Sequence, residues 1–391
     1  MPTITDPNTL LRSLLESGLT AVAPGTALPP HLPPRPATGR ILVLGAGKAS
    51  AHMAKALEDS WDGPLEGAVT VPAGYEADTK WIEVTIASHP TPDARSQAAA
   101  ERALELAGTL GEGDTLIGLI SGGGSALWCA PKGITLEEKQ AMTRRLLADG
   151  SPISEINRTR KEFSRIKGGG LARAAWPART IAFAISDVPG DNAAVIASGP
   201  CSPPEGDPKG DRTTTTLIAA AGDAIEAAAQ AARAEGVEPV VLGIHVEGDA
   251  RAVAKAHAEI ALERAQAAQR PVVLLSGGEL TVTIRGKGRG GRNTEYLLAL
   301  ALALNGAPNV WALAADTDGV DGAAGAAGAR IAPDTLARAA AAGLDARASL
   351  EGSDSAGLFA ALGDLVDTGP TGTNVSDLRA ILVLPQSASA A

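Results

Sequence analysis

Short, continuous runs of apolar residues alternate with helical patterns along the first half of the chain. The runs occupy residues 41–44, 68–71, 82–86, 115–120 and 180–185. Stretches with the spacing of amphipathic helices separate most of them, for example residues 94–110 and 135–148. Strands that are apolar on both faces and alternate with helices are typical of a parallel sheet covered by helices on both sides. The pattern therefore predicts an α/β fold.

A second series of strands and helices follows further along the chain. Strands are expected at residues 240–245, 271–275, 281–284, 310–314 and 380–384, and a long helix at residues 249–268. No linker composition marks the change from one series to the other, so we place the boundary near residue 240. The prediction is an N-terminal domain over residues 1–240 and a smaller C-terminal α/β domain over residues 241–391.

The first residues predict a helix and not a targeting segment. Asp6 can cap this helix, Pro7 suits its first position, and leucines follow at helical spacing. A secretory signal would need a basic stretch followed by an apolar core, and a membrane span would need roughly 18 or more apolar residues. The sequence contains neither, so we expect a cytoplasmic protein without a membrane partner.

Composition narrows the class of protein further. Of the 391 residues, 45% are hydrophobic and 20% are charged, as in ordinary globular proteins, and the formal net charge is −10. A surface of this sign repels nucleic-acid phosphates, so a nucleic-acid partner is not expected. The two cysteines, Cys129 and Cys201, lack metal-ligand spacing, which fits a reducing compartment.

Two glycine-rich turns directly follow predicted strands. The first contains Gly45, Gly47 and Lys48. The second consists of Ser121, Gly122, Gly123, Gly124 and Ser125. Ligands of open α/β sheets bind at the carboxyl ends of the strands, and glycine turns aim backbone N–H groups at anions, so both turns favour a phosphate site. A close-packing turn with a solvated lysine, or a plain flexible loop, would leave the same pattern.

Two further segments combine charge with glycine or turn residues. Lys161 and Arg165 are expected on one helix face, with Lys167 beyond them, which suits either an anion site or a solvated basic face. Asp187 and Asp191 lie four residues apart in a rigid turn. They could hold Mg²⁺ through one or two oxygens, or cap backbone N–H groups, and the sequence leaves both open.

The most distinctive stretch is residues 286–295, where three cations and four glycines precede a strongly helical run. A basic loop at a helix N-terminus predicts an anion site, in which Arg292 could grip a carboxylate or phosphate with two nitrogens. A mobile basic loop is the alternative. Asp316, Asp318 and Asp321 follow the strand at residues 310–314 but lack the downstream glutamate of a calcium loop, which leaves a magnesium site or a site for substrate hydroxyls. The polar turn at residues 369–377 is either structural or closes over a ligand.

Taken in order, these segments resemble the glycerate 2-kinase family, whose C-terminal part is the MOFRL domain. The matching stretches are residues 45–49, 89–93, 121–126, 167–169, 186–191, 196–200, 290–293 together with Glu295, 317–322 and 369–375. The resemblance implies ATP-dependent phosphorylation of D-glycerate at its 2-hydroxyl. It also implies a Rossmann-like αβα sandwich, a smaller C-terminal α/β domain and an active site in the cleft between them. We expect ATP and Mg²⁺ as cofactors, because phosphoryl transfer needs a metal and cations around the phosphates.

By this resemblance Lys48 and Arg292 are the expected catalytic cations, which would neutralise charge on the transferred group. Asp187 is the third expected catalytic residue, and either Asp187 or Asp191 would hold Mg²⁺ or accept the hydroxyl proton. The residues expected to bind nucleotide or substrate are Gly45, Gly47, Ser121, Gly122, Gly123, Gly124, Ser125, Lys167, Asn192, Glu279, Asn293, Glu295 and Asp318.

The chain departs from the family pattern at three places. Thr294 stands where a glutamine is expected, Gly170 where a longer polar side chain is common, and residues 323–325 where Pro-Thr-Asp is common. The last difference weakens the case for an additional metal-binding carboxylate there.

Two other classes of function remain as alternatives. Members of the family have carried the label hydroxypyruvate reductase, which would use NAD(P)H. Ser50 replaces the third glycine of a dinucleotide fingerprint, and no acidic residue ends the strand at residues 68–71, which disfavours that reading. A non-catalytic sensor of nucleotides or sugar acids is the other alternative. The sequence leaves the range of hydroxy acids, the phosphate donor and the oligomeric state open, a homo-oligomer included.

Overall fold

The computed structural model describes residues 4–148, 153–203 and 206–385, which form two compact units. The parallel-sheet unit comprises Ala23–Ala220 and Gly372–Asn374. The mixed-sheet unit comprises Met1–Val22, Ala221–Thr371 and Val375–Ala391. Each unit has its own sheet, and each is described by itself.

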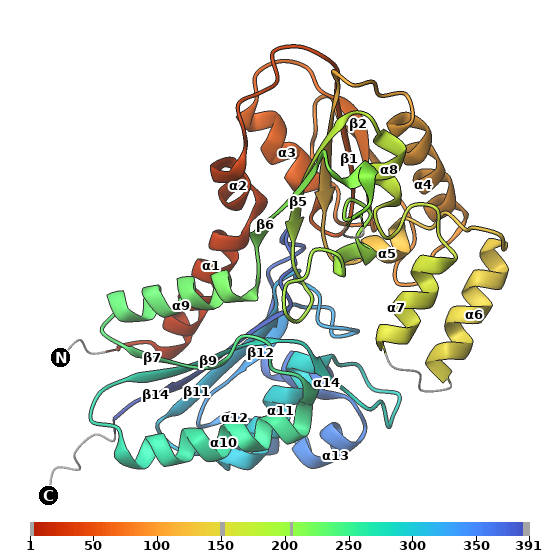
Figure 1. Cartoon of the computed structure of the whole chain (residues 1–391). Coiled ribbons are helices and arrows are strands. Elements are labelled where there is room, and N and C mark those ends of the chain that lie inside the picture. The colour runs from red at the N-terminus through yellow and green to blue at the C-terminus, as the bar shows by residue number, and fades with distance from the viewer. Residues whose placement is uncertain (1–3, 149–152, 204–205, 386–391) are drawn as a thin grey trace, which may run out of the picture. The chain divides into compact units, whose positions relative to one another are not determined.

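The parallel-sheet unit is built on a six-stranded sheet with the order β3-β2-β1-β4-β5-β6, and all of its neighbouring strands are parallel. The strands are β1 (Ile41–Ala46), β2 (Glu66–Val71), β3 (Glu83–Ile86), β4 (Thr115–Ile120), β5 (Arg179–Ile185) and β6 (Thr213–Ala219). The helices are α2 (Pro24–Ala27), α3 (Ser50–Ser60), α4 (Ala94–Ala107), α5 (Gly124–Leu127), α6 (Leu136–Ala148), α7 (Ile153–Glu162) and α8 (Gly170–Ala175). In Figure 1, α3 lies on one side of this sheet and α4 and α8 lie on the other. The predicted parallel α/β sandwich is confirmed.

The mixed-sheet unit has a six-stranded sheet with the order β13-β12-β11-β14-β9-β7. Its strands are β7 (Glu238–Gly243), β9 (Val272–Gly278), β11 (Val310–Asp316), β12 (Gly328–Ile331), β13 (Leu365–Val366) and β14 (Asp377–Val383). Only β7 and β9 pair in parallel, and all other neighbours are antiparallel. The predicted strand at residues 281–284 is shorter in the structure, because β10 (Leu280–Thr281) pairs only with the two residues of β8 (Gly248–Asp249).

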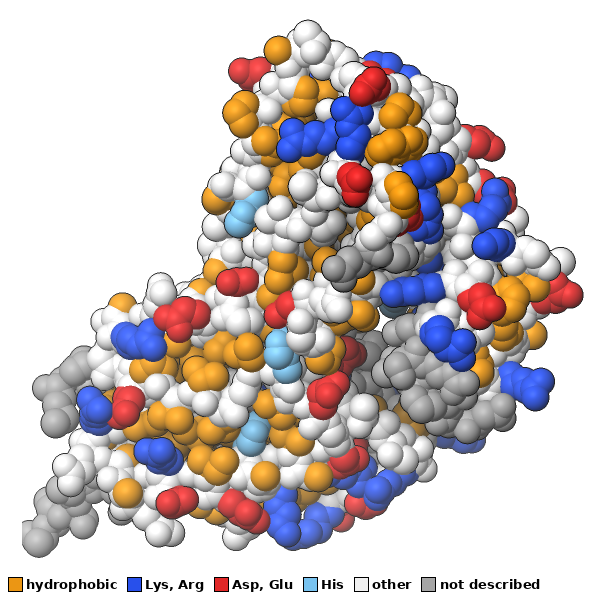
Figure 2. Space-filling model, in the orientation of Figure 1, with side chains coloured by type: hydrophobic (Ala, Val, Ile, Leu, Met, Phe, Trp, Pro, Cys, Tyr) orange, Lys and Arg blue, Asp and Glu red, His pale blue; other side chains and the backbone are white. Residues whose placement is uncertain are grey.

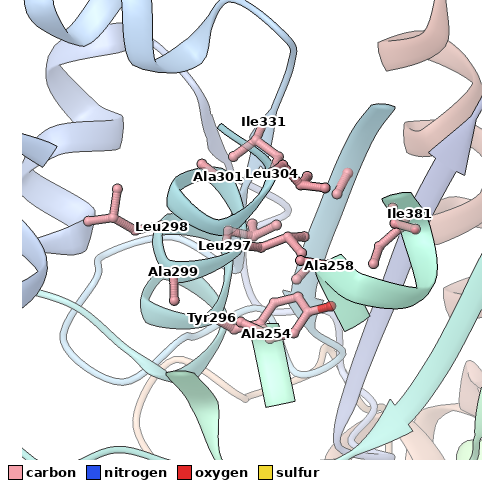
Figure 3. Close-up of a cluster of buried hydrophobic side chains, with 14 of the residues drawn as sticks. Ala254, Ala258, Tyr296, Leu297, Leu298, Ala299, Ala301, Leu304, Ile331 and Ile381 are labelled. Atoms are coloured by element: carbon pink, nitrogen blue, oxygen red, sulfur yellow. The ribbon is translucent and has the colours of Figure 1, made fainter. Parts of the chain in front are cut away.

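Helices cover both faces of the mixed sheet (Figure 1). They are α1 (Pro7–Val22), α9 (Ala221–Ala234), α10 (Ala250–Ala267), α11 (Arg292–Leu304), α12 (Thr335–Ala341), α13 (Ala346–Glu351) and α14 (Ser355–Leu362). Figure 3 shows the core between α10, α11 and the sheet, with Leu297 of α11 directed toward Ala254 and Ala258 of α10. The two alanines are almost completely buried, and their small side chains let the helices approach closely.

The structure divides the chain about 20 residues before the predicted boundary near residue 240. The change of unit falls between Ala220 and Ala221, and the N-terminal helix α1 belongs with the second unit. The leucine face of α1 is buried against this unit, and a Cβ on Gly18 would lie 2.7 Å from Leu378 Cδ1. Helical periodicity revealed that this face is buried but not which partner buries it. The predicted cap is confirmed, since Asp6 Oδ1 accepts the Asn8 N–H at 3.0 Å.

Two surface properties bear on the class of protein. None of the helices in the described ranges is long and apolar enough to cross a membrane. On the face shown in Figure 2, acidic and basic side chains are interspersed over both sheets and their helices.

Candidate active site

The two predicted glycine turns lie against each other at the carboxyl ends of the neighbouring strands β1 and β4. The Lys48 N–H donates to the Gly122 carbonyl at 2.8 Å, and the Ala49 N–H donates to Ser121 Oγ at 2.9 Å. Gly47 has φ +144°, and a Cβ there would lie 2.1 Å from Ser121 Oγ, so only glycine fits. The structure therefore joins the two turns into one loop cluster.

The glycines of this cluster do not all serve the same purpose. A Cβ on Gly45 would lie 2.5 Å from the Leu119 carbonyl oxygen, and one on Gly124 would lie 2.6 Å from that of Ala46. Both glycines are buried and are required for close backbone packing. Gly123 and Ser125 keep exposed surface, so they are the members of the second turn that face solvent.

Lys48 lies beside the second turn with a partly exposed side chain. Its Nζ is 5.9 Å from the centre of the Tyr75 ring. A Cβ on Gly123 would lie 3.5 Å from Lys48 Cγ and 3.3 Å from His89 Nε2. The lysine and the histidine thus flank the exposed glycine of the turn, where an anionic ligand would meet both the ammonium group and the loop backbone.

Asp187 reaches the same cluster from the end of β5. A Cβ on Gly122 would lie 1.9 Å from Asp187 Oδ2, so the carboxylate occupies the space that a side chain would need. Asn374 Nδ2 donates to this oxygen at 3.2 Å. Asn192, further along the turn, is exposed and its Oδ1 accepts the Ala194 N–H at 2.9 Å, which is an Asx turn. The structure brings Asp187 to the glycine turns, whereas Asn192 has a local structural contact.

The basic segment before α8 folds differently from the prediction. Helix α7 ends at Glu162, so Lys161 and Arg165 do not share a helix face. Arg165 instead pairs with Glu101 at 2.6 Å. Lys167 is buried, and its Nζ donates to the Ser125 carbonyl at 2.6 Å. Burial, together with neighbouring cations, holds the pKa of Lys167 well below its usual range.

In the mixed-sheet unit, Arg292 is held by three carboxylates. Its Nε donates to Asp377 at 2.9 Å, its Nη2 to Asp316 at 2.6 Å, and its Nη1 contacts Glu279 at 2.9 Å. The two aspartates are buried, whereas 52% of the Glu279 side chain is exposed. Arg379 adds a second cation with an Nη1 contact to Asp377 at 2.9 Å. The carboxylates raise the pKa of Arg292, while burial raises that of Asp316 well above its usual value.

The predicted anion site at the N-terminus of α11 is already filled by the protein itself. The Asn293 and Thr294 N–H groups each donate to the Asp321 carboxylate at 2.9 Å. The glycine-rich loop before α11 packs against neighbouring backbone, since a Cβ on Gly286 would lie 2.2 Å from the Gly352 carbonyl oxygen. The backbone N–H groups at this helix end are therefore not available to a phosphate, because a carboxylate 27 residues further along the chain from Thr294 caps them.

This capping role predicts a large effect on stability. We expect Asp321→Ala to lower the free energy of unfolding by about 2 to 4 kcal/mol, because it leaves two buried N–H donors without an acceptor. Urea-induced unfolding followed by circular dichroism measures the change. Asp345→Ala, which removes an exposed N-cap that accepts two N–H groups of α13, is the matched control and should cost about 1 kcal/mol. Equal losses in the two variants would contradict the role of Asp321.

Three of the predicted ligand-binding residues are buried and have protein partners. Asn293 Nδ2 donates to Asp377 at 2.8 Å, Glu295 pairs with Arg251 at 2.7 Å, and Asp318 accepts the Val320 N–H at 2.8 Å. Asn293 thus contacts an aspartate of the Arg292 cluster, whereas Glu295 and Asp318 have other partners, and all three residues have almost no exposed surface. Sequence reasoning did not single out Asp377 or Asn374 as members of a site, although both lie in the polar turn whose role it left undecided.

A parallel sheet whose carboxyl edge carries two joined glycine turns, a lysine and an aspartate is typical of α/β proteins that bind phosphorylated ligands. Residues 10–221 match a domain of unknown function, DUF4147, and residues 272–377 match the MOFRL family. D-glycerate 2-kinase of Thermotoga maritima is 34% identical over 410 residues, with 95% of this chain and 98% of the relative covered. The chain belongs to the glycerate kinase family, in which a DUF4147 domain precedes a MOFRL domain.

Two further comparisons bear on the family. The crystal structure of glycerate kinase from Thermotoga maritima superimposes with a TM-score of 0.86 at 33% identity, covering 96% of this chain and 99% of that one. A protein of Agrobacterium vitis named "Putative hydroxypyruvate reductase" is 44% identical over 415 residues, with 96% of this chain and 94% of the relative covered. The family thus includes proteins named for two different reactions.

Proposed function

We propose that the protein is a D-glycerate 2-kinase, which transfers the γ-phosphoryl group of ATP to the 2-hydroxyl of D-glycerate. The observation that carries this proposal is the loop cluster of the parallel-sheet unit, where Lys48 and Asp187 meet the two joined glycine turns. Phosphoryl transfer needs little covalent chemistry from a protein, but it needs donors and cations around the phosphates and a carboxylate for the metal. The names of the kinases among the relatives support the same reaction.

Each member of the loop cluster has a role in this proposal. The exposed backbone of Gly123 and Ser125 would hold nucleotide phosphates, and the Lys48 ammonium would neutralise the charge that develops on the transferred group. Ser121 and Gly122 fix the turns to each other, so the donors are in place before the ligand binds. Preorganisation of this kind is where most of the electrostatic stabilisation of a transition state originates.

Magnesium fits this arrangement through Asp187. The ion takes hard oxygen ligands and in phosphoryl-transfer enzymes uses one or two carboxylates, with phosphate and water oxygens in the other positions. Asp187 offers a partly exposed carboxylate beside the glycine turn, and Asn374 orients it through Oδ2. The described residues contain no group of three or more His, Cys, Asp or Glu side chains placed to form a metal site. Asp187 would therefore hold the ion together with the nucleotide, and Asp191 is proposed as a second ligand.

For Arg292 we propose that only one arm of the guanidinium meets the substrate. Nε and Nη2 face buried aspartates, whereas Nη1 faces the half-exposed Glu279. An exposed ion pair is worth at most about 1 kcal/mol, so a phosphate or carboxylate oxygen can replace Glu279 at Nη1. The buried aspartates would keep the guanidinium in position during this exchange.

The test compares the two reactions for which relatives are named. Purified protein is incubated with D-glycerate, ATP and Mg²⁺ while ADP is measured, and separately with hydroxypyruvate and NADH or NADPH while absorbance at the nicotinamide band is followed. We expect ADP formation that depends on D-glycerate and no oxidation of either nicotinamide. Oxidation of NAD(P)H without ADP formation would overturn the proposal in favour of the reductase.

We place the reaction in the cytoplasm, where ATP is supplied and where the two buried cysteines stay as free thiols.

A further inference from the structure

A pocket of about 230 Å³ in the parallel-sheet unit has no role in the proposal so far. Four of the described residues that line it are basic, and none is acidic. They are Lys139 and Arg144 on α6, Arg160 on α7 and Lys167 just before α8. A protein with a net charge of −10 has thus gathered four cations from three segments around one small cavity.

The cations of this pocket have no anionic partner among the described residues. Lys139 Nζ donates to the Phe163 carbonyl, and Lys167 Nζ donates to the carbonyls of Ser125 and Trp128. Arg160 is partly buried, and its guanidinium makes no hydrogen bond or ion pair with any described residue. Burial lowers the pKa of Lys139 to about 8 and lowers that of Arg160 as well. Unpaired buried cations are costly, so the pocket is arranged for an anion that the protein does not itself supply.

The size of the cavity limits the anion to a small molecule. Pockets for drug-sized ligands range from about 300 to 1,000 Å³, so about 230 Å³ is too small for a whole nucleotide and sufficient for an acid of three carbons. The position of the pocket also favours a small substrate that reacts beside the second glycine turn. Ser125, the last residue of the second glycine turn, lines the pocket. Pro90 lines it too, and the preceding residue, His89, has its ring beside Gly123. The pocket therefore adjoins the turn that we propose holds phosphate.

We propose that this pocket holds the carboxylate of the three-carbon hydroxy acid that accepts the phosphoryl group, with Arg160 and Lys139 as its ligands. This inference rests on the proposed kinase function. Lys167 holds the Ser125 carbonyl in the wall of the pocket through a hydrogen bond, and Arg144 is an exposed cation of the pocket lining. A site with unpaired cations also selects for acids, because a neutral polyol such as glycerol would leave the charges unpaired.

The test uses two arginines of the same helix. Arg160→Gln removes the cation inside the pocket, and Arg158→Gln removes an exposed cation of α7 that does not line it. We expect Arg160→Gln to raise KM for D-glycerate about 10- to 100-fold, the loss of one charged hydrogen bond, with KM for ATP unchanged. Arg158→Gln should match the wild type in both constants. Glycerol has no carboxylate to lose a partner, so its rate of phosphorylation should be no higher in the wild type than in Arg160→Gln.

Other outcomes separate this inference from the kinase proposal. Unchanged KM for D-glycerate in an active Arg160→Gln variant would overturn the pocket assignment and leave the kinase standing. A raised KM for ATP alone would overturn it too, by making the pocket part of the nucleotide site. If the wild type phosphorylates nothing, calorimetric titration with D-glycerate decides: binding by the wild type and its loss in Arg160→Gln support the pocket, and equal binding or none contradicts it. Arg160→Gln removes no hydrogen bond or ion pair to a described residue.

Discussion

We expect the replacement of Lys48 by methionine to lower kcat for D-glycerate phosphorylation about 1,000-fold, the loss of about 4 kcal/mol of transition-state stabilisation. Methionine keeps much of the length and the apolar stem of the side chain and removes only the charge beside the glycine turns. The side chain is partly exposed and lies over the Tyr75 ring at 5.9 Å, a contact worth about 0.5 to 1 kcal/mol, so the fold should remain. Steady-state kinetics with saturating ATP, together with a thermal melt, measures both effects.

Lys55 provides the control for this variant. It lies on α3, the helix that follows the Lys48 turn, and forms an exposed ion pair with Asp59 at 2.5 Å. Lys55→Met removes the same charge outside the loop cluster and should leave kcat unchanged. A near wild-type kcat in Lys48→Met would remove this lysine from the mechanism.

Arg292→Ala is expected to produce the second large effect, a loss of both stability and activity. It leaves Asp316 and Asp377 buried without the guanidinium, and breaking a buried ion pair from one side costs about 3 to 5 kcal/mol. Chemical denaturation measures this loss. Arg330→Ala is the surface control, because its contact with Asp364 is long, at 3.4 Å, and the arginine is 42% exposed. Its expected cost is below about 1 kcal/mol.

A second substitution separates the structural and chemical roles of Arg292. Adding Asp316→Asn to Arg292→Ala removes one of the orphaned charges and should restore part of the stability. If the guanidinium also meets the substrate, kcat of the double variant stays at least about 100-fold below the wild type. Recovery of kcat together with stability would assign Arg292 a positioning role only.

The fold of the parallel-sheet unit was largely predictable from the sequence, because buried parallel strands leave continuous apolar runs. The run at residues 115–120 matches β4, which is buried along its whole length. β6 was missed, since it begins with four threonines, whose β-branched side chains suit a strand but do not form an apolar run. The directions of the strands in the mixed sheet could not be predicted from the sequence either. β14 runs antiparallel to both of its neighbours, and an apolar run carries no sign of direction.

In the candidate site, too, the features with a local sequence signature were predictable and those that depend on distant contacts were not. The glycine turns were predictable because a tight turn leaves a local signature, as Gly47 shows. The Asp321 cap of α11 and the carboxylates around Arg292 were not, because they depend on contacts between residues far apart in sequence. The cationic pocket combines side chains of α6, α7 and the segment before α8, and only the folded chain brings these segments around one cavity.

The most direct test of the central claim is the position of the phosphate in the product. The protein is incubated with D-glycerate, ATP and Mg²⁺, and the phosphoglycerate is examined by proton and phosphorus NMR. We predict a phosphorus signal coupled to the single methine proton of C2, which identifies 2-phospho-D-glycerate. Coupling to the two methylene protons of C3, or no phosphoglycerate at all, would contradict the account.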